Sequence, residues 1–263
     1  MRQNHVAVVH SFEGGRVANL ARMLHCIKHQ KRPPGRAVMK VASYVSGARW
    51  FSERLGSPAA MLDGLNLLLN QLVALLMLLA LSPLMALVAW LTWRKDGAPI
   101  FFAHYRVGRG GKLFRCLKFR TMYRESEQML ADLLRDSPEA REEWERDQKL
   151  SNDPRITPVG HFLRRTSLDE LPQLFNVLRG EMVLVGPRPI TVAELTRYGR
   201  VRWHYLSVRP GITGLWQVSG RNDTTYDERV ALDRSYVEQR TVWLDLQILF
   251  KTVGVVLSRD GAR

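Results

Sequence analysis

The chain has 263 residues, with 39 Lys and Arg against 25 Asp and Glu, which gives a formal net charge of +14. This length accommodates one substantial core next to a membrane segment and argues against two independent domains. The positive charge predicts polyanionic partners: nucleic acid, anionic lipid or phosphorylated substrates. The two cysteines, Cys26 and Cys116, form no close-spaced metal or redox pair, and we interpret both as reduced thiols.

Residues 1–57 are basic and broken by polar side chains, without the apolar stretch of a secretory signal. We therefore expect a basic N-terminal extension that stays on the cytoplasmic side and associates with the membrane surface. Within it, the stretch from Arg16 to Lys31 carries an apolar stripe, which is typical of a helix lying on anionic lipid and equally of a packed helix. Arg32-Pro33-Pro34-Gly35 predicts a linker.

The segment from Leu72 to Trp93 contains no charged residue and is mostly Leu, Ala, Val and Met. Its length meets the roughly 20 apolar residues that a bilayer span requires. Ser82 and Pro83 lie in its middle and predict a bend, because proline removes a helical hydrogen bond. Basic residues flank the segment on both sides, namely Arg49, Arg54, Arg94, Lys95, Arg106 and Arg109.

Basic flanks favour the cytoplasmic side, and a straight span would put one of them on the opposite side. A helix over residues 63–94 that enters the membrane, bends at Ser82-Pro83 and returns satisfies both flanks. We therefore predict a re-entrant membrane helix. A Pro-kinked transmembrane helix and a buried core helix are the alternatives, and the polar residues Asn66, Asn70 and Gln71 argue against deep burial near its start.

Three further regions have recognisable patterns. Residues Tyr105–Met122 mix short apolar and basic runs around glycines, which predicts a small β-hairpin or a loop-rich segment. Between Glu125 and Leu150, charged residues alternate with apolar ones, and Pro138 divides the stretch into two solvated helices. Near the C-terminus, a helical stripe faces either the core, which we favour, or the lipid interface; its members are Trp243, Leu246, Leu249, Phe250, Val253 and Leu257.

The densest group of chemically capable residues begins at Arg164-Arg165 and contains two adjacent carboxylates, Asp169 and Glu170. Ser167 and Glu170 have capping-box spacing, so a helix cap is the structural alternative. Pro172 favours a later helix start near Asp169, since proline lacks the N–H needed beyond the first turn. With either start, we expect the helix N-terminus and the guanidiniums to keep the carboxylates ionised and to attract phosphate. An ionised carboxylate can attack phosphorus.

Several basic residues are candidate phosphate ligands. They are Lys118 and Arg120 in the run 118–122, and Arg188, which follows Pro187 in the Pro-Arg-Pro run 187–189. Taken singly, each is more simply a solvated charge, and only their combination with the carboxylates favours a site. Carboxylate oxygens suit Mg²⁺, which commonly bridges substrate phosphates. Trp216 either stacks a nucleobase or is a buried structural indole, and we favour the second.

Together these motifs resemble the bacterial sugar transferases, the monotopic polyprenyl-phosphate phosphosugar transferases that begin exopolysaccharide and O-antigen assembly. The resemblance runs from about Asp63 to the C-terminus. Its marks occur in one order: Ser82-Pro83, Lys118-Phe119-Arg120-Thr121-Met122, Asn152-Asp153-Pro154-Arg155, Leu168-Asp169-Glu170-Leu171-Pro172-Gln173, Gly186-Pro187-Arg188-Pro189 and Arg209-Pro210-Gly211-Ile212-Thr213-Gly214. So many motifs in this order make the resemblance specific.

The resemblance implies a mainly α fold with a small β element (α+β). It divides the chain into the basic extension 1–57 and a sugar transferase domain over 58–263. That domain would hold the re-entrant helix 63–94 broken at Ser82-Pro83, amphipathic interface helices and a compact catalytic part. Its expected location is the cytoplasmic face of the bacterial inner membrane.

The resemblance also implies a mechanism. Asp169 attacks the sugar-bearing phosphate of a UDP-sugar, releases UMP and holds the phosphosugar until polyprenyl phosphate accepts it. Glu170 is expected to be catalytic as well and to bind Mg²⁺. The substrate-binding residues are then Lys118, Arg120, Arg164, Pro187 and Arg188. The C-terminal part is similar to members thought to transfer galactose 1-phosphate or glucose 1-phosphate.

Two positions depart from the family pattern: Ala59-Ala60 stand where relatives commonly carry Lys-Arg, and His104 stands where they often have Gln. Arg54 or the N-terminal extension is expected to replace the missing membrane anchor, and unchanged membrane association after deletion of the residues before Ser57 would rule this out. Whether the chain forms a homodimer stays open. The alternative functions are a nucleic-acid-binding module and a glycosyltransferase that leaves UDP. The basic residues are scattered and no recognition motif is present, so we do not expect nucleic acid as a partner.

Overall fold

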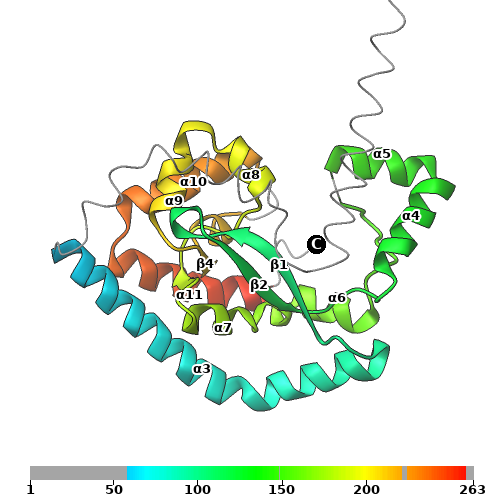
Figure 1. The fold of residues 1–263 in the computed structure, drawn as a ribbon, viewed down its shortest axis with the longest axis horizontal. Coiled ribbons are helices and arrows are strands. Elements are labelled where there is room, and N and C mark those ends of the chain that lie inside the picture. The colour runs from blue at the N-terminus through cyan, green and yellow to red at the C-terminus, as the bar shows by residue number, and fades with distance from the viewer. Residues whose placement is uncertain (1–57, 148, 221–223, 259–263) are drawn as a thin grey trace, which may run out of the picture. The chain divides into compact units, whose positions relative to one another are not determined.

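The computed structural model describes residues 58–147, 149–220 and 224–258, which form mostly helices with two small sheets (Figure 1). The mainly helical α+β prediction is confirmed for these residues, whereas the predicted Arg16–Lys31 helix and the Pro-Gly linker lie outside them. The elements in chain order are α3 (Pro58–Asp96), β1 (Phe101–Val107), η2 (Arg109–Gly111), β2 (Leu113–Phe119), α4 (Ser126–Asp136), α5 (Pro138–Asp147), α6 (Pro158–Arg165), η3 (Leu168–Glu170), α7 (Gln173–Leu178), β3 (Val183–Val185), α8 (Val192–Arg197), η4 (Gly199–Val201), α9 (Arg202–Ser207), β4 (Gly211–Thr213), η5 (Trp216–Val218), α10 (Tyr226–Gln239) and α11 (Val242–Ser258).

The apolar segment forms α3, a single helix of 39 residues that contains Pro83. Figure 1 shows that α3 is bent along its length. Pro83 cannot donate a backbone hydrogen bond, and the Ser82 hydroxyl donates instead to the Leu79 carbonyl at 2.8 Å. The helix continues through both residues, so the predicted break is a bend within one helix.

α3 uses a narrow stripe for packing. Its buried side chains recur at helical spacing, and they are Ala74, Leu78, Met85, Val88 and Thr92. Most of the other apolar side chains of α3 are exposed, with Leu65, Leu79 and Trp93 each more than half accessible. Within the part of the chain that the structure describes, residues Met61–Asp96 are the one helix long and apolar enough to cross a membrane.

The polar residues at the start of α3 attach it to the rest of the domain. Gln71 donates to the Leu178 carbonyl at 2.8 Å, and the Asn70 side chain accepts from the Leu184 N–H at 2.8 Å. These two bonds join α3 to the end of α7 and to β3. The expectation that the start of α3 is not deeply buried is confirmed, because Met61 and Leu65 there are largely exposed.

The predicted hairpin is confirmed as antiparallel strands β1 and β2, with register from Phe101 opposite Phe119 to Val107 opposite Leu113. Buried residues of β2, including Phe114 and Phe119, pack in the main core with Leu174 and Val177 of α7 and the stripe of α3. The predicted pair of helices divided at Pro138 is likewise confirmed as α4 and α5.

A second sheet consists of the short parallel strands β3 and β4, which pair Val183 with Gly211 and Val185 with Thr213. The two backbones approach so closely that a Cβ on Gly211 would lie 2.1 Å from the Gly186 nitrogen. Because only glycine fits there, these residues bring the Gly-Pro-Arg-Pro run against the Arg-Pro-Gly-Ile-Thr-Gly run.

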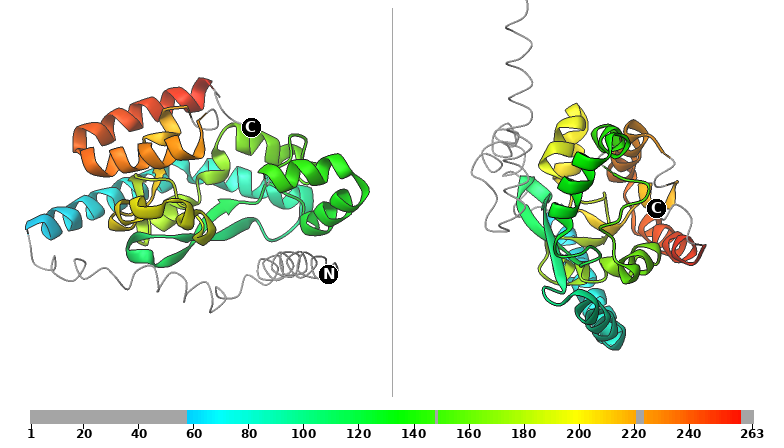
Figure 2. Two further views of the ribbon diagram at one scale, coloured as in Figure 1. Left: turned by 90° about the horizontal axis from the view of Figure 1, so that it is seen from above. Right: turned by 90° about the vertical axis from the view of Figure 1, so that its right-hand side faces the viewer.

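The C-terminal helices α10 and α11, orange and red in Figure 2, each contribute to a small core formed by Val185, Tyr236 and Ile248. Leu249 packs against this core, as predicted. The prediction that the whole stripe of α11 faces the core is wrong. Several of its members are exposed, namely Trp243 at 69%, Leu246 at 42%, Phe250 at 78% and Val253 at 60%.

Candidate active site

The carboxylate pair lies in a tight turn between two short helices. Ser167 has a φ of 56°, a left-handed conformation that costs energy for a residue with a Cβ, and the 3₁₀ turn η3 follows it directly. The Ser167 side chain makes no capping hydrogen bond, so the capping-box alternative is wrong. The α-helix α7 begins later, at Gln173, with Pro172 in the N-cap position, where its missing N–H is not needed. The reversal at Ser167 therefore places Asp169 and Glu170 ahead of α7.

The fold brings Lys118 of β2 onto both carboxylates. Its Nζ lies 2.6 Å from Glu170 Oε1 and 3.5 Å from Asp169 Oδ2. Arg188 lies 3.8 Å from the same Glu170 oxygen through its Nη1. Four of the predicted site residues, from three separate parts of the sequence, thus come together. Two cations and two carboxylates in contact form a site suited to binding phosphate oxygens.

Asn176 of α7 fixes the position of the strand that carries Lys118 relative to the carboxylates. This side chain is 0% exposed and accepts from the Leu117 N–H at 3.0 Å. Its amide nitrogen donates to the Arg115 carbonyl at 2.7 Å and to Glu181 at 2.6 Å. Because these bonds hold the strand on either side of Cys116, they set the register between β2 and α7.

Asp169 is one of the few charged residues of the core, since only 7% of it is exposed. Burial raises its pKa above the ordinary value for aspartate, the neighbouring Glu170 carboxylate adds to this, and Lys118 and Arg164 oppose it. Burial thus acts against the neighbouring cations, which favour the ionised carboxylate. Perturbed carboxyl pKa values of this kind occur often at functional sites.

Arg164 is a further cation that acts on the carboxylate of Asp169. Its Nε donates to Thr121 Oγ1 at 2.9 Å, and its charge acts on both Asp169 and Asp153. Asp153 in turn forms two bonds of 2.7 Å with Arg155. The Asn-Asp-Pro-Arg run thus supplies a buried ion pair next to Arg164. The close approach of α6 to Thr121 depends on Gly160, where a Cβ would lie 2.0 Å from the Thr121 carbonyl oxygen.

Arg120 does not join the carboxylates, although it is only two residues from Lys118. Its guanidinium donates to the carbonyls of Asp96 and Gly97 at 3.1 and 2.7 Å and pairs with the Asp96 carboxylate at 3.2 Å. Arg120 follows the end of β2 and closes the C-terminal end of α3. Pro187 is buried, and its carbonyl accepts from the Gly211 N–H at 2.9 Å, which fixes the backbone before Arg188.

A second polar cluster, which the sequence reasoning missed as part of a site, adjoins Arg188. Glu194 pairs with Arg106 at 3.2 Å and with Arg229 at 3.4 Å. Asp233, 3% exposed, accepts from the Tyr198 hydroxyl at 2.7 Å, and burial raises the pKa of Asp233 to about 6. No local motif marks these residues, because the pairs are separated by 35 to 88 positions.

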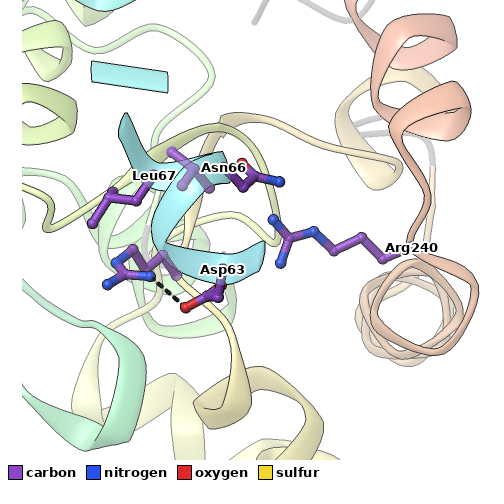
Figure 3. A pocket seen from close by; sticks show the side chains of 6 residues that line it. Asp63, Asn66, Leu67 and Arg240 are labelled. Atoms are coloured by element: carbon purple, nitrogen blue, oxygen red, sulfur yellow. Dashed lines mark hydrogen bonds and ion pairs between the residues drawn. The ribbon is translucent and has the colours of Figure 1, made fainter. Parts of the chain in front are cut away.

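The start of α3 carries a further group of arginines. The Asp63 carboxylate pairs with Arg109 and, at 3.2 Å, with Arg209 of the Arg-Pro-Gly run. Figure 3 shows Arg240, from the connection between α10 and α11, pointing toward Asn66 across a pocket that Asp63 also lines. Arg54, predicted as a replacement anchor, lies outside the described residues. Arg109 and Arg209 hold this end of α3 against the domain.

The predicted thiol state is confirmed for Cys116, which is a free, buried cysteine. Cys26 lies outside the described residues. Among the residues that the structure describes, no group of three or more His, Cys, Asp and Glu side chains could hold a metal ion. A divalent cation at this site would therefore need oxygen ligands from a substrate or from water in addition to the carboxylates.

Comparison with known proteins agrees with the family resemblance of the motifs. The chain belongs to the bacterial sugar transferase family, whose pattern matches residues 63–259. It is 58% identical over 189 residues to an undecaprenyl-phosphate galactose phosphotransferase of Salmonella typhimurium, covering 72% of this chain and 40% of the relative. It is 50% identical over 191 residues to the exopolysaccharide production protein ExoY of Rhizobium meliloti, covering 73% and 84%.

A more distant relative is the UDP-glucose:undecaprenyl-phosphate glucose-1-phosphate transferase of Escherichia coli, 38% identical over 205 residues, with 73% of this chain and 41% of the relative covered. The chain thus spans about two fifths of the length of the Salmonella and Escherichia relatives and most of the length of the Rhizobium one. The shared part is the one that contains the carboxylate pair.

Proposed function

We propose that the chain transfers a hexose 1-phosphate from a UDP-sugar to a polyprenyl phosphate, with undecaprenyl phosphate as the carrier. The observation that carries this proposal is the contact of Lys118 with both Asp169 and Glu170 in a member of the bacterial sugar transferase family. Relatives are named for undecaprenyl phosphate as a substrate and for galactose or glucose as the sugar. We further propose that the product begins an exopolysaccharide or O-antigen chain; the Rhizobium relative is named an exopolysaccharide production protein.

The reaction proceeds in two displacements at one phosphorus atom. In the first, an Asp169 carboxylate oxygen attacks the sugar-bearing phosphorus, the bond from that phosphorus to the bridging oxygen breaks, and UMP leaves with the oxygen and its electron pair. In the second, an oxygen of the lipid phosphate attacks the same phosphorus, and the bond to Asp169 breaks. The carboxylate is regenerated, and the lipid carries a diphosphate linked to the sugar.

The neighbours of Asp169 fit this chemistry. Lys118 and Arg188 are close enough to Glu170 to compensate negative charge on a diphosphate that enters the site. The charge of Arg164 also acts on the Asp169 carboxylate. Burial favours the protonated form of Asp169, whereas Lys118 and Arg164 favour the ionised form that attacks phosphorus.

The site also fits Mg²⁺. Glu170 offers carboxylate oxygens, which are the ligands Mg²⁺ prefers, and a diphosphate with water would complete the set. When bound, the ion would neutralise charge on the diphosphate. Glu170 is the proposed protein ligand. Its contacts with Lys118 and Arg188 show that positive charge already gathers at this carboxylate, where the diphosphate would bind.

The lipid substrate requires the site to lie at a bilayer surface. The exposed apolar side chains of α3 and of α11, with Trp93, Trp243 and Phe250 among them, would contact lipid. We propose that α3 is the re-entrant helix, bent at Ser82-Pro83, and that both its ends face the cytoplasm. The catalytic part would then lie on the cytoplasmic face of the bacterial inner membrane.

A product assay tests the proposal. The full chain, in membranes or detergent, is incubated with undecaprenyl phosphate, Mg²⁺ and either UDP-galactose or UDP-glucose, and the released nucleotide is identified. We expect UMP and lipid-linked hexose phosphate with one or both donors. Release of UDP would indicate a glycosyltransferase, and no release with any UDP-sugar of a panel, together with salt-dependent binding of duplex DNA, would indicate a nucleic-acid-binding module. Either result would refute the proposal.

A further inference from the structure

The indole of Trp216 contacts two arginines. The Cζ atom of Arg229 lies 4.6 Å from the ring centroid, and that of Arg188 lies 5.7 Å from it. A guanidinium within about 6 Å of an indole centroid is attracted by the negative face of the ring. The ring that the sequence offered as a platform for a nucleobase is therefore already engaged by side chains of the protein itself.

The backbone around Arg188 is fixed by hydrogen bonds, whereas its side chain has few contacts that would fix its rotamer. The Gly186 N–H donates to the Thr213 carbonyl at 2.8 Å, and the Pro187 carbonyl accepts from Gly211 at 2.9 Å. The side chain itself is 35% exposed, and its distance of 3.8 Å to Glu170 exceeds a hydrogen bond. A long arginine side chain held only by this loose ion pair would sample several rotamers.

Trp216 is well placed to restrict those rotamers, because it is anchored itself. Its Nε1 donates to Thr224 Oγ1 at 2.7 Å, just before α10 begins. Arg229, only 8% exposed, presses on the same ring and is held by Glu194. Within the described part of the chain, Nε and Nη2 of Arg229 have no hydrogen-bond partner, so the ring contact stabilises this side of the guanidinium.

We infer that Trp216 is a positioning residue, which holds the Arg188 guanidinium beside Glu170 by a cation–π contact and does not stack a nucleobase. Arg229 contacts the same ring and is itself paired with Glu194, which adds to this support. The inference rests on the proposed function only in taking Arg188 as a phosphate ligand. The placement of Arg188 by Trp216 can be measured without substrate.

The substrate-free test is modification of the full-length protein by phenylglyoxal, with the rate at each arginine measured by mass spectrometry of peptides. Trp216→Leu should raise the rate at Arg188 several-fold, and Trp216→Phe, which keeps an aromatic face, should stay near the wild-type rate. Arg135, which is 68% exposed, serves as the internal standard, and Arg155, which is 10% exposed, reports unfolding. An Arg188 rate in Trp216→Leu equal to that of the wild type would overturn the inference.

If Trp216→Leu also raises the rate at Arg155, the variant has lost its fold. The gentler comparison of Trp216→Met with Trp216→Phe then decides by the same criterion, because both residues fill much of the same space and only one has an aromatic face. A higher Arg188 rate in Met than in Phe supports the inference. Equal rates contradict it.

Kinetics provide the second arm. Trp216→Leu should lower kcat/KM for UMP release about tenfold, Trp216→Phe should restore most of it, and in an Arg188→Ala background Trp216→Leu should have little further effect. A residue that only stabilises the fold would lower kcat/KM equally in both backgrounds, and this result would contradict the inference. If the wild type releases no UMP at all, the proposed function fails, whereas the modification rates still judge the placement of Arg188.

Discussion

Replacement of Asn176 by alanine tests how the site is held together. Asn176 is fully buried and joins α7 to β2 through the Leu117 N–H and the Arg115 carbonyl, and it also donates to Glu181. Alanine removes all three bonds and leaves a gap at a fully buried position, next to partners that are partly buried. The change should therefore destabilise the protein and also loosen the strand that carries Lys118.

The expected magnitude follows from the kinds of bonds lost. Two bonds are between neutral groups and contribute about 1 kcal/mol each, and the bond to the Glu181 carboxylate contributes about 2 kcal/mol. The sum is about 4 kcal/mol. For a domain of roughly 200 residues, 1 kcal/mol corresponds to about 2–4 °C in Tm, so Asn176→Ala should lower Tm by roughly 8–16 °C.

The assay is thermal unfolding of the purified protein in one detergent, with Asn152→Ala as the matched control. Asn152 is exposed, and its replacement should change the free energy of unfolding by less than about 0.5 kcal/mol. Asn176→Asp should be at least as harmful as Asn176→Ala, because it places a second carboxylate against Glu181. A Tm for Asn176→Ala within about 2 °C of the wild type would refute the claim that the Asn176 hydrogen bonds hold β2 against α7.

Three further predictions concern the carboxyl groups and the close packing. Lys118→Met removes the cation that lowers the pKa of Asp169 most, so the pKa of that carboxyl should rise further. The acid limb of the pH profile of kcat/KM should then move to higher pH, and an unmoved limb would contradict the assigned role. Asp233 has a pKa of about 6 against an ordinary value of 3.8, so the protonated form favours the native state and this stability is lost as the pH rises from about 4 through 6. Asp233→Asn should therefore gain stability relative to the wild type over this range, by on the order of 3 kcal/mol, as measured by unfolding at pH 4.5 and 7.5. Gly160→Ala should lower Tm strongly, because its Cβ would meet a backbone oxygen at 2.0 Å, whereas Gly64→Ala, with nothing within 4 Å, should not; similar Tm values for both would refute the close approach.

Much of the fold could be predicted from local patterns. The apolar run with Pro83 predicted a bent helix, and Pro138 predicted the division of α4 from α5. The glycine-containing run 105–122 predicted a hairpin or a loop-rich segment, of which the structure has the hairpin. These predictions succeed because each depends on residues close together in the chain. The face of α11 was predicted wrongly, since a helical stripe of apolar residues looks the same whether it meets a core or remains exposed.

The sequence identified several residues of the site but not their contacts or the direction of the Asp169 pKa shift. The local run containing Asp169 and Glu170 identified the carboxylates, but their contact with Lys118 joins positions 51 and 52 residues apart and depends on the packing of β2 against α7. Arg120 belongs to the same motif as Lys118 and yet pairs with Asp96, because it follows the end of the strand. The raised pKa of Asp169 could not be read from neighbouring charges, since burial sets its direction.

The most direct test of the central claim is a search for the covalent phosphosugar on Asp169. The wild-type protein is mixed with UDP-galactose or UDP-glucose without lipid acceptor, quenched and examined by mass spectrometry, with Asp169→Asn as the control and a melting curve to show that this variant is folded. We predict an added hexose phosphate on the peptide that contains Asp169, lost on addition of undecaprenyl phosphate and absent in Asp169→Asn. An active protein with no adduct, an adduct on another residue, or turnover by Asp169→Asn would contradict the account.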